Sequence, residues 1–129
     1  MIAMRIDIDD DRRWFRPGET VSGRALWTFD AASDAVELRL FWHTSGKWTQ
    51  DVGIVERARF DAGSRQGDRR FYFTVPAGPY SFSGSLITLS WGLELVRIPD
   101  GDAELVEVVV APTPVEVRLQ SLEREPRGF

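Results

Sequence analysis

Large apolar residues recur at every second position along most of this chain, and that alternation limits the folds open to it. A period of two is typical of strands with one buried face. In the segment after Pro17-Gly18, the residues Val21, Gly23, Ala25 and Trp27 share one face. The expected strands cover residues 4–8, 21–29, 36–43, 48–60, 71–75, 85–95 and 105–110.

These strands are short and separated by turn signals, and no amphipathic helix interrupts them. This pattern predicts an all-β fold, an immunoglobulin-like antiparallel β-sandwich of about seven to eight strands. The length of 129 residues fits one domain. We expect the sandwich to cover residues 1–112 and a C-terminal tail, either an edge strand or partly disordered, to cover 113–129.

The segment from residue 48 to 60 breaks the alternation. Val52 and Ile54 would point into the core, and Glu56 would then follow them inward. A β-bulge or an edge position would resolve the conflict, because an extra residue shifts the parity of a strand.

Composition excludes several classes of function. The formal net charge is -4, from 20 acidic and 16 basic residues, which disfavours binding to nucleic acid. The chain has no cysteine and one histidine, so thiolate chemistry and multi-histidine metal sites are excluded. No apolar run approaches the ~20 residues of a membrane-spanning helix. Arg5 interrupts the N-terminal apolar residues too early for an export signal, so we expect a cytoplasmic protein.

Two motifs carry a family resemblance. Residues 15–23 read F-R-P-G-E-T-V-S-G, and residues 71–76 read F-Y-F-T-V-P, followed by P-Y-S-F-S-G at 79–84 and a long alternating strand. Pro17-Gly18 favours a turn, Gly23 indicates a close backbone approach or a bend, and Pro76 ends a strand. In this order the motifs resemble the N-terminal domain of the arrestin-like superfamily, which includes trafficking adaptors and bacterial sporulation-control proteins.

The resemblance implies an arrestin-type sandwich that acts as a non-enzymatic interaction or adaptor module without a cofactor. We expect it to bind an unknown protein partner through a sheet edge or an outer face. A homodimer through the tail, Val115 to Leu119, would rebuild the two-sandwich arrangement of arrestins. No functional residue is carried over from the family. The alternative is a small hydrolase or a carbohydrate-active or carbohydrate-binding domain on the same scaffold.

A candidate interaction surface follows from side chains expected on outer faces or loop ends. Exposed aromatic residues often mark interfaces, and paired arginines can bind an anion or an acidic partner. Arg57 and Arg59 could equally form a solvated face, and Trp14 could simply cover the end of the sandwich. The candidate residues are Trp14, Phe41, Trp48, Arg57, Arg59 and Tyr72.

Two further patterns suggest chemistry and have simpler interpretations. His43 could act as a general base near Ser45 or Asp51, but a surface histidine explains it as well. The spacing of Asp7, Asp9 and Asp11 could hold a cation if they share one strand face, or could form a solvated acidic edge. The sequence lacks the other positions of an EF-hand loop.

Overall fold

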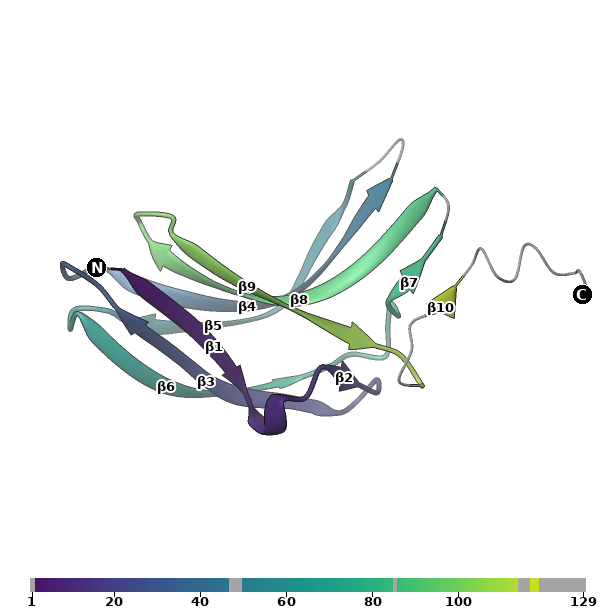
Figure 1. The fold of residues 1–129 in the computed structure, drawn as a ribbon, viewed down its shortest axis with the longest axis horizontal. Coiled ribbons are helices and arrows are strands. Elements are labelled where there is room, and N and C mark those ends of the chain that lie inside the picture. The colour runs from purple at the N-terminus through teal and green to yellow at the C-terminus, as the bar shows by residue number, and fades with distance from the viewer. Residues whose placement is uncertain (1, 47–49, 85, 114–116, 119–129) are drawn as a thin grey trace, which may run out of the picture.

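Two β-sheets packed face to face make up the part of the chain that this computed structural model describes, residues 2–46, 50–84, 86–113 and 117–118 (Figure 1). Apart from the single-turn 3-10 helix η1 (Asp9–Asp11), all of its regular structure is β-strand. The predicted all-β sandwich is therefore confirmed. Among the described residues, no helix is long and apolar enough to cross a membrane.

The small sheet has three antiparallel strands in the order β1–β3–β6. Its alternating side chains, among them Val21, Trp27 and Phe71, are buried against the other sheet. The strands are β1 (Ala3–Ile8), β3 (Thr20–Thr28) and β6 (Gln66–Thr74).

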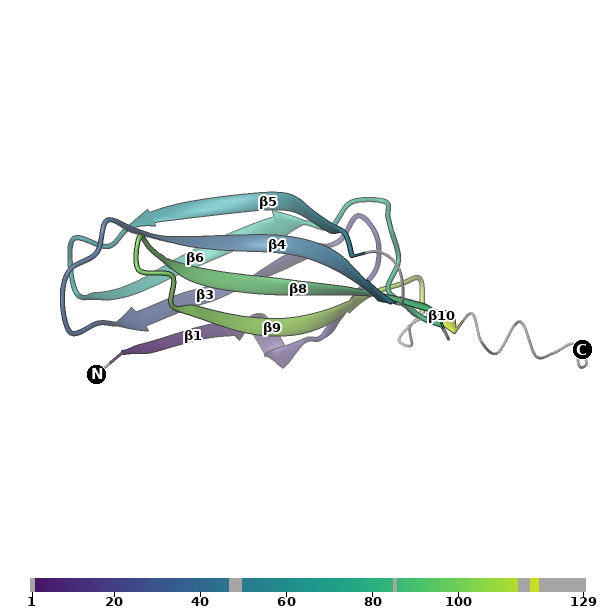
Figure 2. The same ribbon diagram turned by 90° about the horizontal axis from the view of Figure 1, so that it is seen from above.

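The large sheet runs in the order β5–β4–β8, with β9 and β7 pairing different stretches of the far side of β8. Figure 2 shows β5, β4, β8 and β9 side by side in one layer, with β6, β3 and β1 behind them. Two of the two-residue strands extend this sheet in parallel pairing, β2 beside β9 and β10 beside β7. The strands are β5 (Val52–Asp61), β4 (Ala35–Gly46), β8 (Ile87–Ile98), β9 (Ala103–Val110), β7 (Phe82–Ser83), β2 (Trp14–Phe15) and β10 (Val117–Arg118).

The core between the sheets holds the side chains that the alternation predicts. Leu38, Leu40 and Leu93 are fully buried, and complete burial stabilises the fold by roughly 1.5–3 kcal/mol for each such side chain. Trp27 and Trp91 are buried in this core as well, and Trp42 is half-buried against it.

A β-bulge in β5 resolves the register conflict of the sequence. Leu40 pairs with Glu56 but Phe41 pairs with Ile54, so Val55 is the extra residue. The predicted bulge is confirmed, and β5 is also an edge strand. The expected inward direction of Val52 and Ile54 is wrong, because the bulge returns both to the outer face beside Phe41. Glu56 lies on the inner face, where its carboxylate accepts a hydrogen bond from the Thr74 N–H at 3.1 Å.

The two sequence motifs meet in space. The Gly18 N–H donates to the Val75 carbonyl, and the Val75 N–H donates to the Glu19 carbonyl, both at 2.8 Å. Gly18 has a φ of +88°, a turn conformation that glycine adopts without strain. Hydrogen bonds from the Arg16 N–H and the Arg12 guanidinium lower the pKa of Glu19 and hold its carboxylate on the turn. The motifs thus form one structural joint between the start of β3 and the end of β6.

Arg97 fixes the opposite end of the sandwich. Its side chain is only 4% exposed and forms a 3.2 Å ion pair with Asp102. It also donates to Ser33 Oγ and lies 4.3 Å above the ring of Phe29. A single buried guanidinium therefore links the β3–β4 loop to the turn between β8 and β9.

The large sheet projects beyond the small one at the end of the β4–β5 hairpin, where β4, β5 and β8 bend away from β3 and β6 (Figure 1). Residues Thr44 to Gly46, which lie beyond the strand expected over 36–43, continue β4 and pair with β8. In the tail, Val117 and Arg118 pair with Phe82 and Ser83 of the same chain. The other residues of the segment predicted to mediate dimerisation lie outside the described part.

Gly23 of β3 lies directly beside the backbone of β1, where it pairs with Ile8. A Cβ there would lie 2.0 Å from the carbonyl oxygen of Asp7, which confirms the predicted close approach. We expect Gly23→Ala to lower the free energy of unfolding by about 2 kcal/mol or more, because neither backbone can yield. The measurement is urea unfolding followed by tryptophan fluorescence.

Gly63→Ala is the matched control, since its Cβ would meet only the Asp61 carboxylate, at 3.3 Å. This variant should stay within about 0.5 kcal/mol of the parent protein. Equal losses of unfolding free energy in the two variants would contradict a close approach of β1 to Gly23.

Candidate functional site

Phe41 lies at the centre of the outer face of the large sheet. It pairs with Ile54 of β5 on one side and with Gly92 of β8 on the other. A Cβ on Gly92 would lie 3.3 Å from the ring atoms Cε1 and Cζ of Phe41, so the ring leans over β8. The absence of a side chain at Gly92 is what allows the half-buried ring to take this position.

Apolar side chains surround Phe41. We call this set the Phe41 patch. Val52 is 66% exposed, Ile54 39% and Leu105 56%, while His43 stacks on Phe41 with ring centroids 5.9 Å apart. Contiguous exposed apolar side chains on a sheet face are typical of interaction sites. The members are Phe41, His43, Val52, Ile54 and Leu105.

A shallow groove of about 500 Å³ follows the patch. All five patch residues line it, and Arg39 and Glu94 form one of its sides. These two side chains are joined by an ion pair of 3.5 Å. The groove therefore offers an apolar surface with a neutralised polar border.

A chain of ion pairs continues beside the groove. Glu37 binds Arg39 at 2.7 Å and lies 3.9 Å from Arg59. Arg57, by contrast, takes part in no ion pair with any described residue. Arg57 and Arg59 are exposed on the outer face, as a role in binding a partner requires.

The outer face of the small sheet is different in character. Arg24 pairs with Asp68 at 3.0 Å, and Arg70 binds Asp9 through two hydrogen bonds of 2.8 Å. Tyr72 is 66% exposed on this face, with the Arg70 guanidinium 5.2 Å above its ring. The charges here are mutually paired, which is typical of a solvated face.

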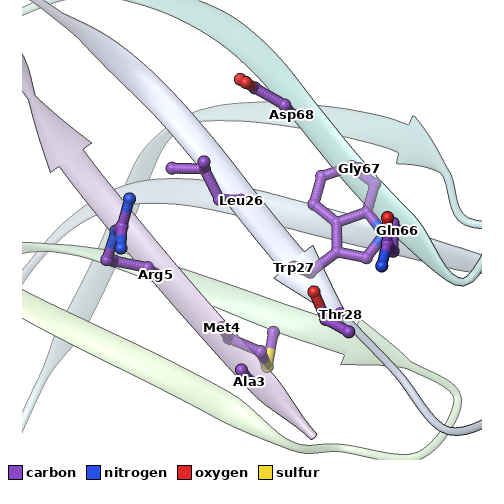
Figure 3. Close-up of a pocket in the computed structure, with 9 residues that line it drawn as sticks. All are labelled: Ala3, Met4, Arg5, Leu26, Trp27, Thr28, Gln66, Gly67 and Asp68. Atoms are coloured by element: carbon purple, nitrogen blue, oxygen red, sulfur yellow. The ribbon is translucent and has the colours of Figure 1, made fainter.

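A hollow of about 600 Å³ lies at the open end of the small sheet, where Leu26 sits between Arg5 and Asp68 (Figure 3). Arg5 pairs with Asp7, and Asp68 pairs with Arg24, so both charges already have partners. The Nε1 atom of Trp27 is buried and has no hydrogen-bond partner among the described residues.

The structure does not gather the predicted surface residues in one place. Phe41, Arg57 and Arg59 share the outer face of the large sheet, whereas Tyr72 lies on the opposite side of the molecule. Trp14 covers the junction of β2 and β9, where its Nε1–H donates to the Ala111 carbonyl at 2.9 Å. Trp48 lies outside the described residues.

Two pairs of arginines that are close in the sequence lie on different sheets. Arg57 and Arg59 are on β5, but Arg69 and Arg70 are on β6 of the other sheet. Arg69 lies 5.0 Å above the ring of Phe60. Sequence reasoning missed Val52, Ile54 and Leu105 as site residues. The only available signal for the first two was the register conflict at Glu56.

The acidic cluster is not a strand face. β1 ends at Ile8, and Asp9 and Asp11 belong to η1. Each carboxylate has its own arginine: Asp7 with Arg5, Asp9 with Arg70 and Asp11 with Arg13. Within the described residues, no group of three or more acidic or histidine side chains could hold a metal ion.

Comparisons with known proteins agree with this architecture. No protein-family model matches the chain, and no curated protein sequence matches it. Its fold is that of an arrestin-like all-β sandwich. It is similar to the crystal structure of Spo0M, a sporulation control protein from Bacillus subtilis, with a TM-score of 0.60 and 15% identity over 88% of this chain. The chain spans about half, 50%, of the length of that protein.

The pairing of Asp9 predicts a pH dependence. Hydrogen bonds from Arg70 and then from Ser22 lower the pKa of Asp9 from 3.8 to about 2. Because the pKa in the folded protein is below its unfolded value, the contribution to stability is complete above 3.8 and is lost as the pH falls towards 2. Carboxyl 13C NMR titration should give a pKa of about 2 for Asp9.

Arg70→Ala should return the pKa of Asp9 towards 3.8, because it removes the principal hydrogen bonds. Arg5→Ala removes the partner of Asp7 and should leave the pKa of Asp9 unchanged. An unshifted Asp9 in the parent protein would contradict this geometry.

Proposed function

We propose that this chain is a non-enzymatic protein-interaction module of arrestin-like type that binds a protein partner through the outer face of the large sheet, at the Phe41 patch. The observation that carries this proposal is the exposure of Val52, Ile54 and Leu105 around a half-buried Phe41. In this proposal residues 1–112 are the binding domain and 113–129 its tail.

The contrast between the two outer faces supports the choice of surface. The small sheet presents paired charges. A partner that docks there must bury these charges or break their ion pairs, and either change costs free energy. The large sheet presents apolar side chains whose burial is favourable by about 25 cal/mol for each Å² removed from water. Docking on the large sheet is therefore the energetically simpler process.

The free edge of β5 supports binding less well than its face does. The bulge at Val55 interrupts the regular backbone ladder, and Glu56 points inward next to it. Bulges and inward charges are devices by which proteins block strand addition at an edge. Face docking is accordingly favoured over addition of a peptide strand to β5.

An enzymatic role finds little support at the groove. Glu94 is tied to Arg39 by an ion pair, and His43 stacks on Phe41 without a hydrogen bond to Ser45 or Asp51. Acid–base catalysis needs two convergent titratable groups within reach of a substrate. The groove lining is instead that of a docking surface.

The proposal is tested by placing a photocrosslinking side chain on each face in cells of the source organism. Leu105→p-benzoylphenylalanine should give a discrete crosslinked adduct, because this position lies in the interface. The same replacement at Tyr72 is the control, since it has a similar exposure on the other sheet.

Phe41→Ser, introduced beside the Leu105 crosslinker, should abolish the adduct while the thermal unfolding curve stays cooperative. An adduct only from Tyr72, or none from Leu105, would contradict docking at the Phe41 patch.

A further inference from the structure

Charge is distributed unevenly across the outer face of the large sheet. Its β5 side carries Arg57 and Arg59, which we call the basic rim. Its β8–β9 side carries Glu107 and Glu94, of which Glu94 is paired with Arg39, and we call these two the acidic rim. The Phe41 patch lies between the rims, because Phe41 pairs across β8 and β9 through Gly92 to Glu107.

Each rim holds a charge without a partner. Arg57 and Glu107 form no ion pair with any described residue, whereas other charged groups on the two outer faces are paired, among them Arg24, Arg39 and Arg70 with their acidic partners. An exposed charge is solvated by water and needs no partner. Two charges of opposite sign on opposite sides of one apolar patch, however, give this face a dipole. An occupant of this face must present an acidic side to β5 and a basic side to β9.

A second copy of the same face meets that requirement. A two-fold axis that lies in the interface, roughly along the strands, places β5 of one copy over β8 and β9 of the other. The basic rim of each copy then faces the acidic rim of its partner, and this occurs twice, as in any isologous contact. The same operation brings Ile54 of one copy towards Leu105 of the other.

We propose that the Phe41 patch is the contact surface of a face-to-face homodimer, held by burial of the apolar side chains and by complementary rims. The inference rests on the proposed function of this face as a docking surface and names its partner as a second copy of this chain. Face-to-face sheets pack about 10 Å apart with strand directions within about 30° of each other. That spacing accommodates the interdigitated side chains of Phe41, Val52 and Leu105.

The size of the face is adequate for such a contact. Four strands about 4.8 Å apart, each contributing about nine residues at ~3.3 Å, cover a flat area of roughly 600 Å². The accessible surface is larger, because side chains project from the sheet. Stable interfaces bury about 800 Å² on each partner. The apolar patch alone is smaller than this, so the charged rims must belong to the interface.

The test is sedimentation equilibrium of the full chain at concentrations up to about 100 µM, above the micromolar range of weak interfaces of this size. The parent protein should show a monomer–dimer equilibrium. The basic-rim variant, Arg57→Glu with Arg59→Glu, and the acidic-rim variant, Glu94→Arg with Glu107→Arg, should each weaken dimerisation about tenfold or more, since like charges then face each other.

Mixing the two variants is the decisive step. In the mixed dimer every rim contact again joins opposite charges, so the mixture should associate more tightly than either variant alone. Circular dichroism checks that each variant is folded, and Tyr72→Ser, on the other outer face, should dimerise like the parent.

A parent protein that remains monomeric at the highest concentration, or a mixture no tighter than its components, would overturn the homodimer. The proposed function would then be decided separately by the Leu105 crosslink. An adduct with a different protein would uphold docking at this face and reject the second copy, whereas an adduct of twice the chain mass would uphold both.

Discussion

One extra residue in an edge strand determines the surface of this protein. Val55 has no partner on β4, and the strand reverses its parity there. On one side of the bulge Phe60 belongs to the core; on the other, Val52 and Ile54 turn outward beside Phe41. A shift of one residue in a strand moves every following side chain to the opposite face. Without the bulge, these two apolar residues would point inward, and of the patch only His43 and Leu105 would remain beside Phe41.

The two outer faces differ in character. The small sheet ends in mutually paired charges, such as Arg70 with Asp9, and water can solvate such a surface at little cost. The large sheet presents an apolar centre between rims of opposite charge. Val52, Ile54 and Leu105 in this centre are exposed to solvent. In our proposal the same scaffold keeps one face solvated and uses the other for association.

The alternation of the sequence predicted the strands, the shared face of Val21 and Trp27 and the sandwich, because burial on one face imposes a period of two. The two motifs predicted the turn at Gly18 and the end of a strand before Pro76, but not that Gly18 and Val75 are hydrogen-bonded to each other. The candidate surface was harder to predict. Periodicity assigns an outward direction to Tyr72 and to Phe41 alike, but it does not say which sheet each strand joins. The position of the bulge depends on the pairing of β5 with β4, which no local pattern encodes. Arg97 was missed for the same reason, since Ser33 and Phe29, which contact its side chain, lie in a loop distant in sequence.

The outward direction of Ile54 is the most direct test of this account. Methyl-selective NMR can measure nuclear Overhauser effects from the Ile54 side chain in the intact chain. We expect contacts with the ring of Phe41, the cross-strand partner of Ile54 on the outer face. Contacts with Trp42 and the buried residues of β3 instead would mean that β5 continues without a bulge, and the Phe41 patch would not exist.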